Sequence, residues 1–85
     1  MHELKVAATL VEFLEKICAE KKPQKVVRLT LKVNPYSCLS QESLSFAFAS
    51  LAEGKKLFEK ARLKIIKNQD PASREIVVDS VEILV

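Results

Sequence analysis

The sequence is poor in the residue types on which most enzymes and zinc modules depend. It has one histidine, one glycine, no tryptophan and two cysteines among 85 residues. With one histidine near a terminus, the chain offers no Cys–His pair and no Ser–His–Asp set, and a single glycine cannot build a phosphate-binding loop. We therefore expect that the protein is not an enzyme.

The two cysteines, Cys18 and Cys38, lie twenty positions apart and form no CxxC pair. This spacing indicates neither a zinc knuckle nor a redox pair. Cys18 falls on the apolar side of a predicted helix, where a buried thiol packs like a small hydrophobic residue. Cys38 precedes a predicted helix start, which can lower a thiol pKa, but no neighbouring histidine is available to make a catalytic pair.

A basic leader and a long apolar run are also missing, so we expect a cytoplasmic protein without membrane contact. The net charge of +3 includes short lysine clusters at 21–25 and 55–60. Such short clusters favour solvated helix ends over a nucleic-acid interface, which normally adds stacking aromatic residues beside its cations. The fractions of 48% hydrophobic and 29% charged residues fit one small folded domain, residues 1–85.

The only histidine stands in the sequence Met1-His2-Glu3, which places an amine, an imidazole and a carboxylate within three residues. The amine nitrogen, the His2 amide nitrogen and the imidazole can close fused chelate rings, most easily in a plane. Such donors suit Ni(II) or Cu(II), whereas structural zinc prefers a closed tetrahedron. Met1, His2 and Glu3 are therefore candidate metal ligands. The alternative is that the histidine is accidental and that Glu3 only complements the dipole of the following helix.

The first half of the chain shows helical and then strand periodicity. Apolar residues recur at helical spacing from Leu4 to Cys18, which predicts an amphipathic helix over about 4–20 that ends at 21–23, before a proline. Strict alternation predicts a strand with one buried face that is stopped by Asn34-Pro35. The residues expected on the buried face of the strand are Val27, Leu29, Leu31 and Val33.

A second helix is predicted over about 41–53. Ser40 is a good N-cap, and Leu39 and Leu44 have the spacing of a hydrophobic staple. Gly54 stands where a left-handed C-cap is expected. The apolar stripe of this helix is expected at Leu44, Ala47, Phe48 and Leu51.

Two further strands follow, over about 61–67 and 75–85, separated by a turn at 68–74. In the last strand the apolar parity changes, which predicts a β-bulge near Asp79-Ser80 that keeps five residues facing inward: Ile76, Val78, Val81, Ile83 and Val85. The order α-β-α-β-β predicts an α+β two-layer sandwich, with two helices on one face of a three-stranded mixed sheet and the last two strands forming a hairpin. The exposed edge of the last strand favours a homodimer, although charged outer residues can equally keep the chain monomeric.

Several stretches of the chain together resemble a known family. The start Met1-His2-Glu3-Leu4, the strand 26–33, and the runs 42–48, 51–54 and 61–65 look like HypA/HybF, the nickel-insertion accessory proteins of [NiFe]-hydrogenase and urease maturation. The resemblance covers nearly the whole chain. It implies a nickel metallochaperone that binds Ni(II) through Met1, His2 and Glu3, and it implies nickel-enzyme maturation proteins or a hydrogenase precursor as partners.

The chain also departs from the pattern of that family. The family normally inserts a zinc lobe, built on two CxxC pairs, between its last two strands, whereas here only the loop 68–74 stands there, so no structural zinc is expected. The usual Gly-Glu after the first strand is replaced by Asn34-Pro35, which affects the expected partner recognition. The alternative function is therefore a HypA-like protein-interaction module without metal function, acting through a sheet edge or a helix face.

Overall fold

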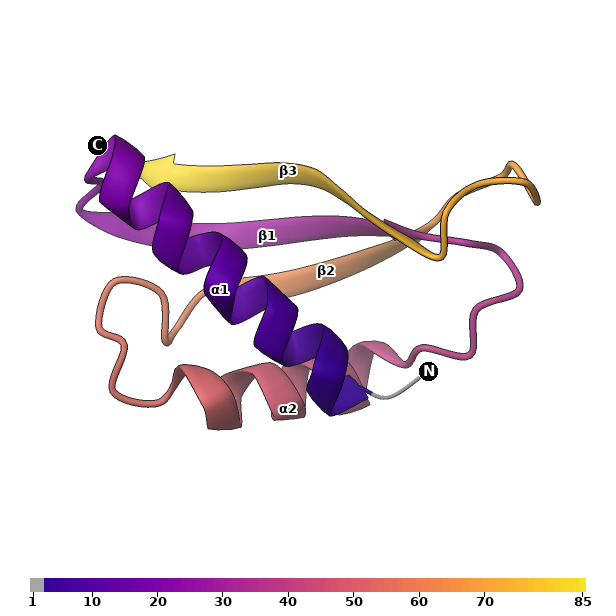
Figure 1. Ribbon diagram of the computed structural model, residues 1–85, viewed down its shortest axis with the longest axis horizontal. Helices are drawn as coiled ribbons and strands as arrows, with labels where there is room; N and C mark the ends of the chain where they lie inside the picture. Colours follow the sequence, from indigo (N-terminus) through magenta and orange to yellow (C-terminus); the bar gives the residue numbers. More distant parts are fainter. Residues whose placement is uncertain (1–2) are drawn as a thin grey trace.

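The computed structural model describes residues 3–85 and contains the five expected elements in the expected order. They are α1 (Glu3–Lys21), β1 (Lys25–Val33), α2 (Gln41–Ala52), β2 (Arg62–Lys67) and β3 (Ile76–Leu84). The two helices pack on one face of the three-stranded sheet, with α1 crossing in front of the strands and α2 lying beside β2 (Figure 1). The predicted α+β two-layer sandwich is confirmed.

Helix α1 buries one stripe, Ala7, Leu10, Val11 and Leu14, as its helical periodicity predicts. The expected packing of Leu4 is wrong, because its side chain is 60% exposed in the first turn. The helix stops after Lys21. Lys22 has a φ of +48°, its N–H donates to the carbonyl of Cys18 at 3.0 Å, and Pro23 follows.

Helix α2 begins as predicted, because the Ser40 side chain accepts a hydrogen bond from the Ser43 N–H at 3.1 Å. The helix ends at Ala52, and Gly54, two residues later, has a φ of +85°, a backbone conformation that favours glycine. The buried stripe is Leu44, Phe48 and Ala52. The prediction for Leu51 is wrong, since Leu51 is 37% exposed and the core contact falls on Ala52 instead.

The strand order is β2-β1-β3, so the predicted hairpin between the last two strands is wrong. Strand β2 pairs with β1 in parallel, and β3 pairs with the other side of β1 in antiparallel orientation. Strand β1 is the most deeply buried of the three, with Val26, Leu29, Leu31 and Val33 all fully buried. Strand β1 lies at the centre of the sheet because an apolar strand buries most of its surface when strands pair with it on both sides. The connection through α2 makes β2 parallel to β1.

The predicted β-bulge in β3 is confirmed. Thr30 pairs with Ser80 and Leu31 pairs with Val78, so Asp79 is the extra residue. The bulge keeps four of the five expected residues packed against the core, namely Ile76, Val78, Val81 and Ile83. The expectation for Val85 is wrong, because it follows the end of β3 and is 87% exposed.

A second bulge, in β1, was not predicted. Val26 pairs with Ile83 and Arg28 pairs with Glu82, which leaves Val27 without a partner. The bulge turns Val26 into the core, whereas Val27 is only half-buried, so the expected inward position of Val27 is wrong. Between residues 3 and 85, no helix is both long enough and apolar enough to cross a membrane.

Candidate functional site

The candidate metal ligands lie at the start of the chain, and only one of them can be placed. Met1 and His2 lie outside the described residues. Glu3 is the first residue of α1 and is half-buried. A carboxylate in the first turn of a helix is stabilised by the positive end of the helix dipole, so the position of Glu3 is explained even without a metal.

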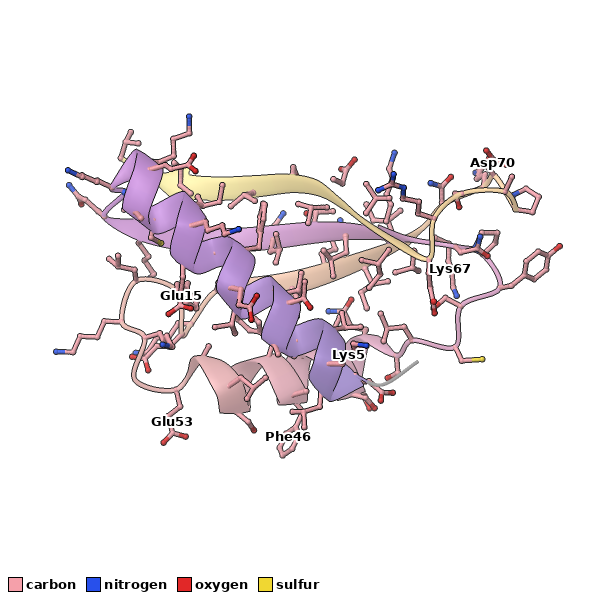
Figure 2. The ribbon with its side chains drawn as sticks, in the orientation of Figure 1. Lys5, Glu15, Phe46, Glu53, Lys67 and Asp70 are labelled. Carbon is pink, nitrogen blue, oxygen red and sulfur yellow. The ribbon has the colours of Figure 1, made fainter. Side chains whose placement is uncertain are left out.

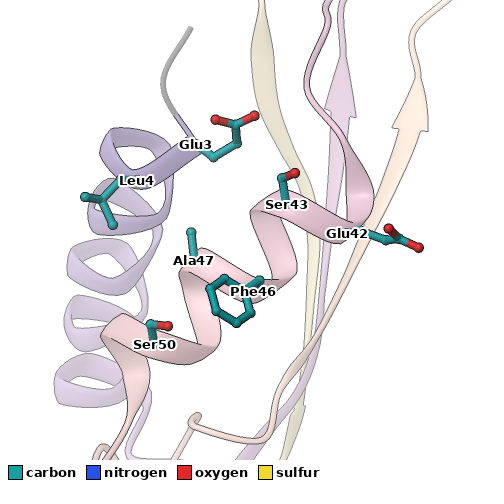
Figure 3. A pocket seen from close by; sticks show the side chains of 7 residues that line it. All are labelled: Glu3, Leu4, Glu42, Ser43, Phe46, Ala47 and Ser50. Carbon is teal, nitrogen blue, oxygen red and sulfur yellow. The ribbon is translucent and has the colours of Figure 1, made fainter.

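An open hollow of about 670 Å³ lies between the first turns of α1 and α2. Glu3 and Leu4 line it from α1, and five residues line it from α2: Glu42, Ser43, Phe46, Ala47 and Ser50 (Figure 3). Both helices therefore begin at the same end of the molecule. The two positive dipole ends carry one carboxylate each, Glu3 on α1 and Glu42 on α2, and the two carboxylates lie apart in Figure 3.

The rim of this hollow carries the most exposed apolar side chains of the two helices. Phe46 is 76% exposed and Leu4 is 60% exposed. Figure 2 shows Phe46 projecting from α2 away from the rest of the molecule. An aromatic ring in water contributes nothing to the core, so these residues do not stabilise the domain through burial.

Metal-ligating side chains do not gather elsewhere in the described part of the chain. Between residues 3 and 85, no group of three or more His, Cys, Asp and Glu side chains is close enough to hold an ion. Cys18 packs against the core from α1, and burial raises the pKa of its thiol, whereas Cys38 is exposed in the loop before α2.

The loop 68–74 is tied to the end of β1 through Asn34, which sequence reasoning treated only as a strand stop. The Asn34 Nδ2 donates to the carbonyl of Pro71 at 3.1 Å and to that of Ser73 at 2.8 Å. Its Oδ1 accepts from the N–H of Tyr36 at 2.9 Å. One side chain thus organises two loops that are distant in the sequence, a role that local periodicity does not reveal.

Gln41, the first residue of α2, was also missed. Its Nε2 donates to the carbonyl of Leu63, and its Oε1 accepts from the N–H of Ile65 at 2.9 Å. The side-chain amide therefore binds the outer edge of β2 in the way that a neighbouring strand would. It occupies part of an edge that would otherwise be open.

Comparison with known proteins supports one assignment. Residues 1–81 match the model of the family described as "Hydrogenase/urease nickel incorporation, metallochaperone, hypA". The chain is 34% identical over 67 residues to a hydrogenase maturation factor HypA from Azotobacter chroococcum mcd 1, covering 79% of this chain. It is 38% identical over 65 residues to the factor of the same name from Moorella thermoacetica (strain ATCC 39073 / JCM 9320), covering 76% of this chain.

The matches cover only 58% and 57% of the length of these two relatives. The fold is similar to the solution structure of the Ni metallochaperone HypA from Helicobacter pylori, with a TM-score of 0.79 and 16% identity. That similarity covers 99% of this chain and 98% of the other. At this identity the structural likeness supports the fold, and the family assignment depends on the sequence match.

Proposed function

This chain belongs to the HypA family, whose model matches residues 1–81, and we propose that it is a nickel metallochaperone that serves the maturation of a nickel enzyme of the [NiFe]-hydrogenase type. In this proposal it binds Ni(II) as cargo through Met1, His2 and Glu3. The observation that carries the proposal is the family match, which includes the only histidine of the chain.

The donor set fits an ion that has to be passed on. The terminal amine, the His2 amide nitrogen and the imidazole supply nitrogen donors in a plane, and Glu3 adds a carboxylate from the first turn of α1. Leu4 and Phe46, which line the hollow beside Glu3, supply no metal-ligating groups. Within residues 3–85, no cluster of His, Cys, Asp and Glu side chains competes with this site for the ion. Such a site releases its metal by ligand exchange more readily than an enclosed one.

Nickel binding at this site is expected to weaken in acid. The amine and the imidazole bind metal only when deprotonated, and their ordinary pKa values are about 8 and 6.5. Protons therefore compete with Ni(II) for both nitrogens as the pH falls through this range. Weaker binding in acid also favours release of the cargo there.

The test is calorimetric titration of the untagged chain with Ni(II), beside the variants His2→Ala and Glu3→Gln. We expect His2→Ala to lower the affinity at least about a hundredfold, because the imidazole closes one of the chelate rings. Glu3→Gln is expected to lower it less, because the nitrogen donors remain. Equal binding by the wild-type chain and His2→Ala would refute the nickel site.

A matched control separates the amine from the histidine. Acetylation of the terminal amine keeps His2 and Glu3 but removes the amine as a donor, so the chelate ring between the amine and the His2 amide nitrogen cannot close. We expect the acetylated chain to bind Ni(II) as weakly as His2→Ala does. If it binds like the wild-type chain, the amine is not a ligand.

Three further properties follow from this function: the compartment, the partners and the domain content of the chain. We propose that the chain acts in the cytoplasm without catalysis, and that it hands nickel to maturation proteins or to a hydrogenase precursor. The family is described as a metallochaperone, which supports this role. Residues 1–85 act as one domain, in which the loop 68–74 takes the place of a zinc lobe and no structural zinc is bound.

A second candidate is a protein-interaction module that works through a sheet edge, and the asymmetry of the sheet favours it. Gln41 covers part of the edge of β2, but no described strand pairs with the outer edge of β3. The core-facing residues of β3 are only partly buried. A second copy of the chain could therefore pair along β3 and form a homodimer.

Measurement of the molar mass in solution by light scattering tests this alternative. A dimer that forms with or without Ni(II), persists in His2→Ala and is lost in Leu84→Lys would support it, because a lysine at the end of β3 opposes strand pairing. Phe46→Lys is the matched control, since it places the same charge on an exposed residue of α2. A monomer under all conditions excludes the homodimer.

A further inference from the structure

The sheet has a second face, which the helices do not cover. Leu29, Leu31 and Val33 of β1 are fully buried against the helices. Because successive strand residues point to opposite faces, Arg28, Thr30 and Lys32 lie on the other one. Register places the alternate residues of β2 and β3 beside them, among them Lys64 opposite Thr30.

This uncovered face is basic. Five exposed cationic residues share it, and we refer to them and their surroundings as the basic sheet face: Lys25, Arg28, Lys32, Arg62 and Lys64. Two acidic residues of β3, Asp79 and Glu82, lie on the same side. The excess of three positive charges equals the net charge of +3 of the whole chain, so the remainder of the molecule is neutral in sum.

The positive charge of this face is only partly balanced across the strands. Arg28 of β1 lies directly opposite Arg62 of β2. Like charges at paired positions of neighbouring strands are destabilising. Among the residues of this face, only Lys32 has an ion pair within 4 Å, with Asp79 at 3.6 Å. Arg28 also lies opposite Glu82 of β3, so part of the charge is balanced, but Arg62 and Lys64 of β2 have no acidic residue opposite them.

We propose that the basic sheet face is a docking surface for an acidic helix of a partner protein. Acidic residues at helix positions i and i+4 lie about 6 Å apart, close to the roughly 6.7 Å between alternate residues of a strand. A helix with such an acidic stripe can lie along β1 and β2 and meet Arg28, Arg62 and Lys64 together. It also covers the open face in the way that helices cover the opposite one.

Charge and composition argue against two other occupants. A second copy that docked with the same face would bring together ten cations and four acidic residues, and this excess of positive charge opposes association. A nucleic acid normally finds aromatic side chains to stack on, and none of the residues that register places on this face is aromatic. The complementary surface is therefore an acidic protein element.

The test uses a fluorescein-labelled helical peptide with glutamate at every fourth position, titrated at low ionic strength and followed by fluorescence anisotropy. We expect the triple variant Arg28→Ala, Arg62→Ala, Lys64→Ala to bind about tenfold or more weakly than the wild-type chain. Affinity for the wild-type chain is expected to fall as salt is added, because exposed charges are screened.

The matched control removes the same net charge from α1 through Lys5→Ala, Lys16→Ala, Lys21→Ala, all three exposed. We expect this variant to bind the peptide within about threefold of the wild-type affinity. The sheet triple variant is expected to unfold close to the wild-type temperature, because it loses both the like-charge pair of Arg28 with Arg62 and the opposite-charge pair of Arg28 with Glu82. Should it fail to fold, the single variant Arg62→Thr serves the same comparison.

Three results would overturn the proposal. They are an equal loss of affinity in both triple variants, no binding of the peptide to the wild-type chain, and tighter binding of a single-stranded oligonucleotide or a phosphatidylserine vesicle through the same three residues. The proposal does not depend on nickel binding, because His2→Ala leaves the basic sheet face unaltered. Failure of the nickel titration and failure of the peptide titration are therefore distinguishable.

Discussion

At the scale of single residues, the two cysteines differ in burial, and burial affects the pKa of a thiol. Cys18 packs against the core, and desolvation raises the pKa of its thiol, whereas Cys38 is exposed. Sequence periodicity already placed Cys18 on the apolar side of α1. Neither thiol belongs to a group of three metal-ligating side chains within residues 3–85.

The raised pKa of Cys18 predicts how stability changes in alkali. In the unfolded chain this thiol ionises near 9.0, whereas the folded chain holds the proton to higher pH. Above that pH the unfolded state binds fewer protons, so the free energy of unfolding falls as the pH rises, and no such effect exists below it. Urea unfolding between about pH 8 and 10 measures this slope.

The variants Cys18→Ala and Cys38→Ala separate the two thiols. We expect a shallower alkaline decline in Cys18→Ala and the wild-type slope in Cys38→Ala. Identical slopes in all three proteins would show that ionisation of Cys18 does not limit alkaline stability.

At the scale of elements, the outer edges of the two edge strands, β2 and β3, are covered to different degrees. The side-chain amide of Gln41 binds the carbonyl of Leu63 and the N–H of Ile65, so α2 closes part of the β2 edge on which it packs. Strand β3 has no such partner among the described residues, although Asp79 forms a bulge in its middle. Bulges and charges are common means of limiting edge pairing, so β3 is only partly protected.

Replacement of Gln41 tests the closing of this edge. We expect Gln41→Ala to lower the free energy of unfolding by about 1–2 kcal/mol, because two backbone groups of β2 lose their partner. The Ile65 amide is expected to exchange hydrogen faster, since its bond to Oε1 is lost. Gln69→Ala, an exposed loop residue, is the control and is expected to leave both quantities unchanged. Unaltered exchange at Ile65 would contradict the role of Gln41.

At the scale of the whole molecule, the chain joins β2 to β3 across the end of β1. The loop 68–74 makes this crossing, and Asn34 at the end of β1 holds it through the carbonyls of Pro71 and Ser73. The Asn34 N–H also donates to the carbonyl of Glu75 at 2.9 Å. This contact fixes the path that brings β3 to the far side of β1 rather than beside β2.

Removal of the Asn34 amide is expected to loosen the crossing. Asn34→Asp keeps the acceptor for the Tyr36 N–H but lacks the donor to Pro71 and Ser73, whereas Asn34→Ala lacks both functions. We expect losses in the free energy of unfolding of about 1 kcal/mol for Asn34→Asp and about 2 kcal/mol for Asn34→Ala. Equal stability of both variants and the wild-type chain, measured by urea unfolding, would show that the backbone alone holds the loop.

The sequence by itself determined the elements, their order, both caps of α2 and the bulge at Asp79, because these depend on local periodicity and on the chemistry of single residues. It also marked Met1, His2 and Glu3 as candidate ligands, a prediction that stands untested by the described residues. Strand order, the bulge at Val27 and the burial of Ala52 were decided only by tertiary structure.

The physical reason is the range of the interactions involved. A residue pattern tells which face of an element is apolar, but it does not tell which neighbour will cover that face. Strand β1 has two neighbours because it alone buries residues along its whole length, so β2 and β3 are the two edge strands of the sheet. Gln41 covers part of the β2 edge. The same strand order brought Arg28 and Arg62 together on the uncovered face, a juxtaposition that no local pattern contains.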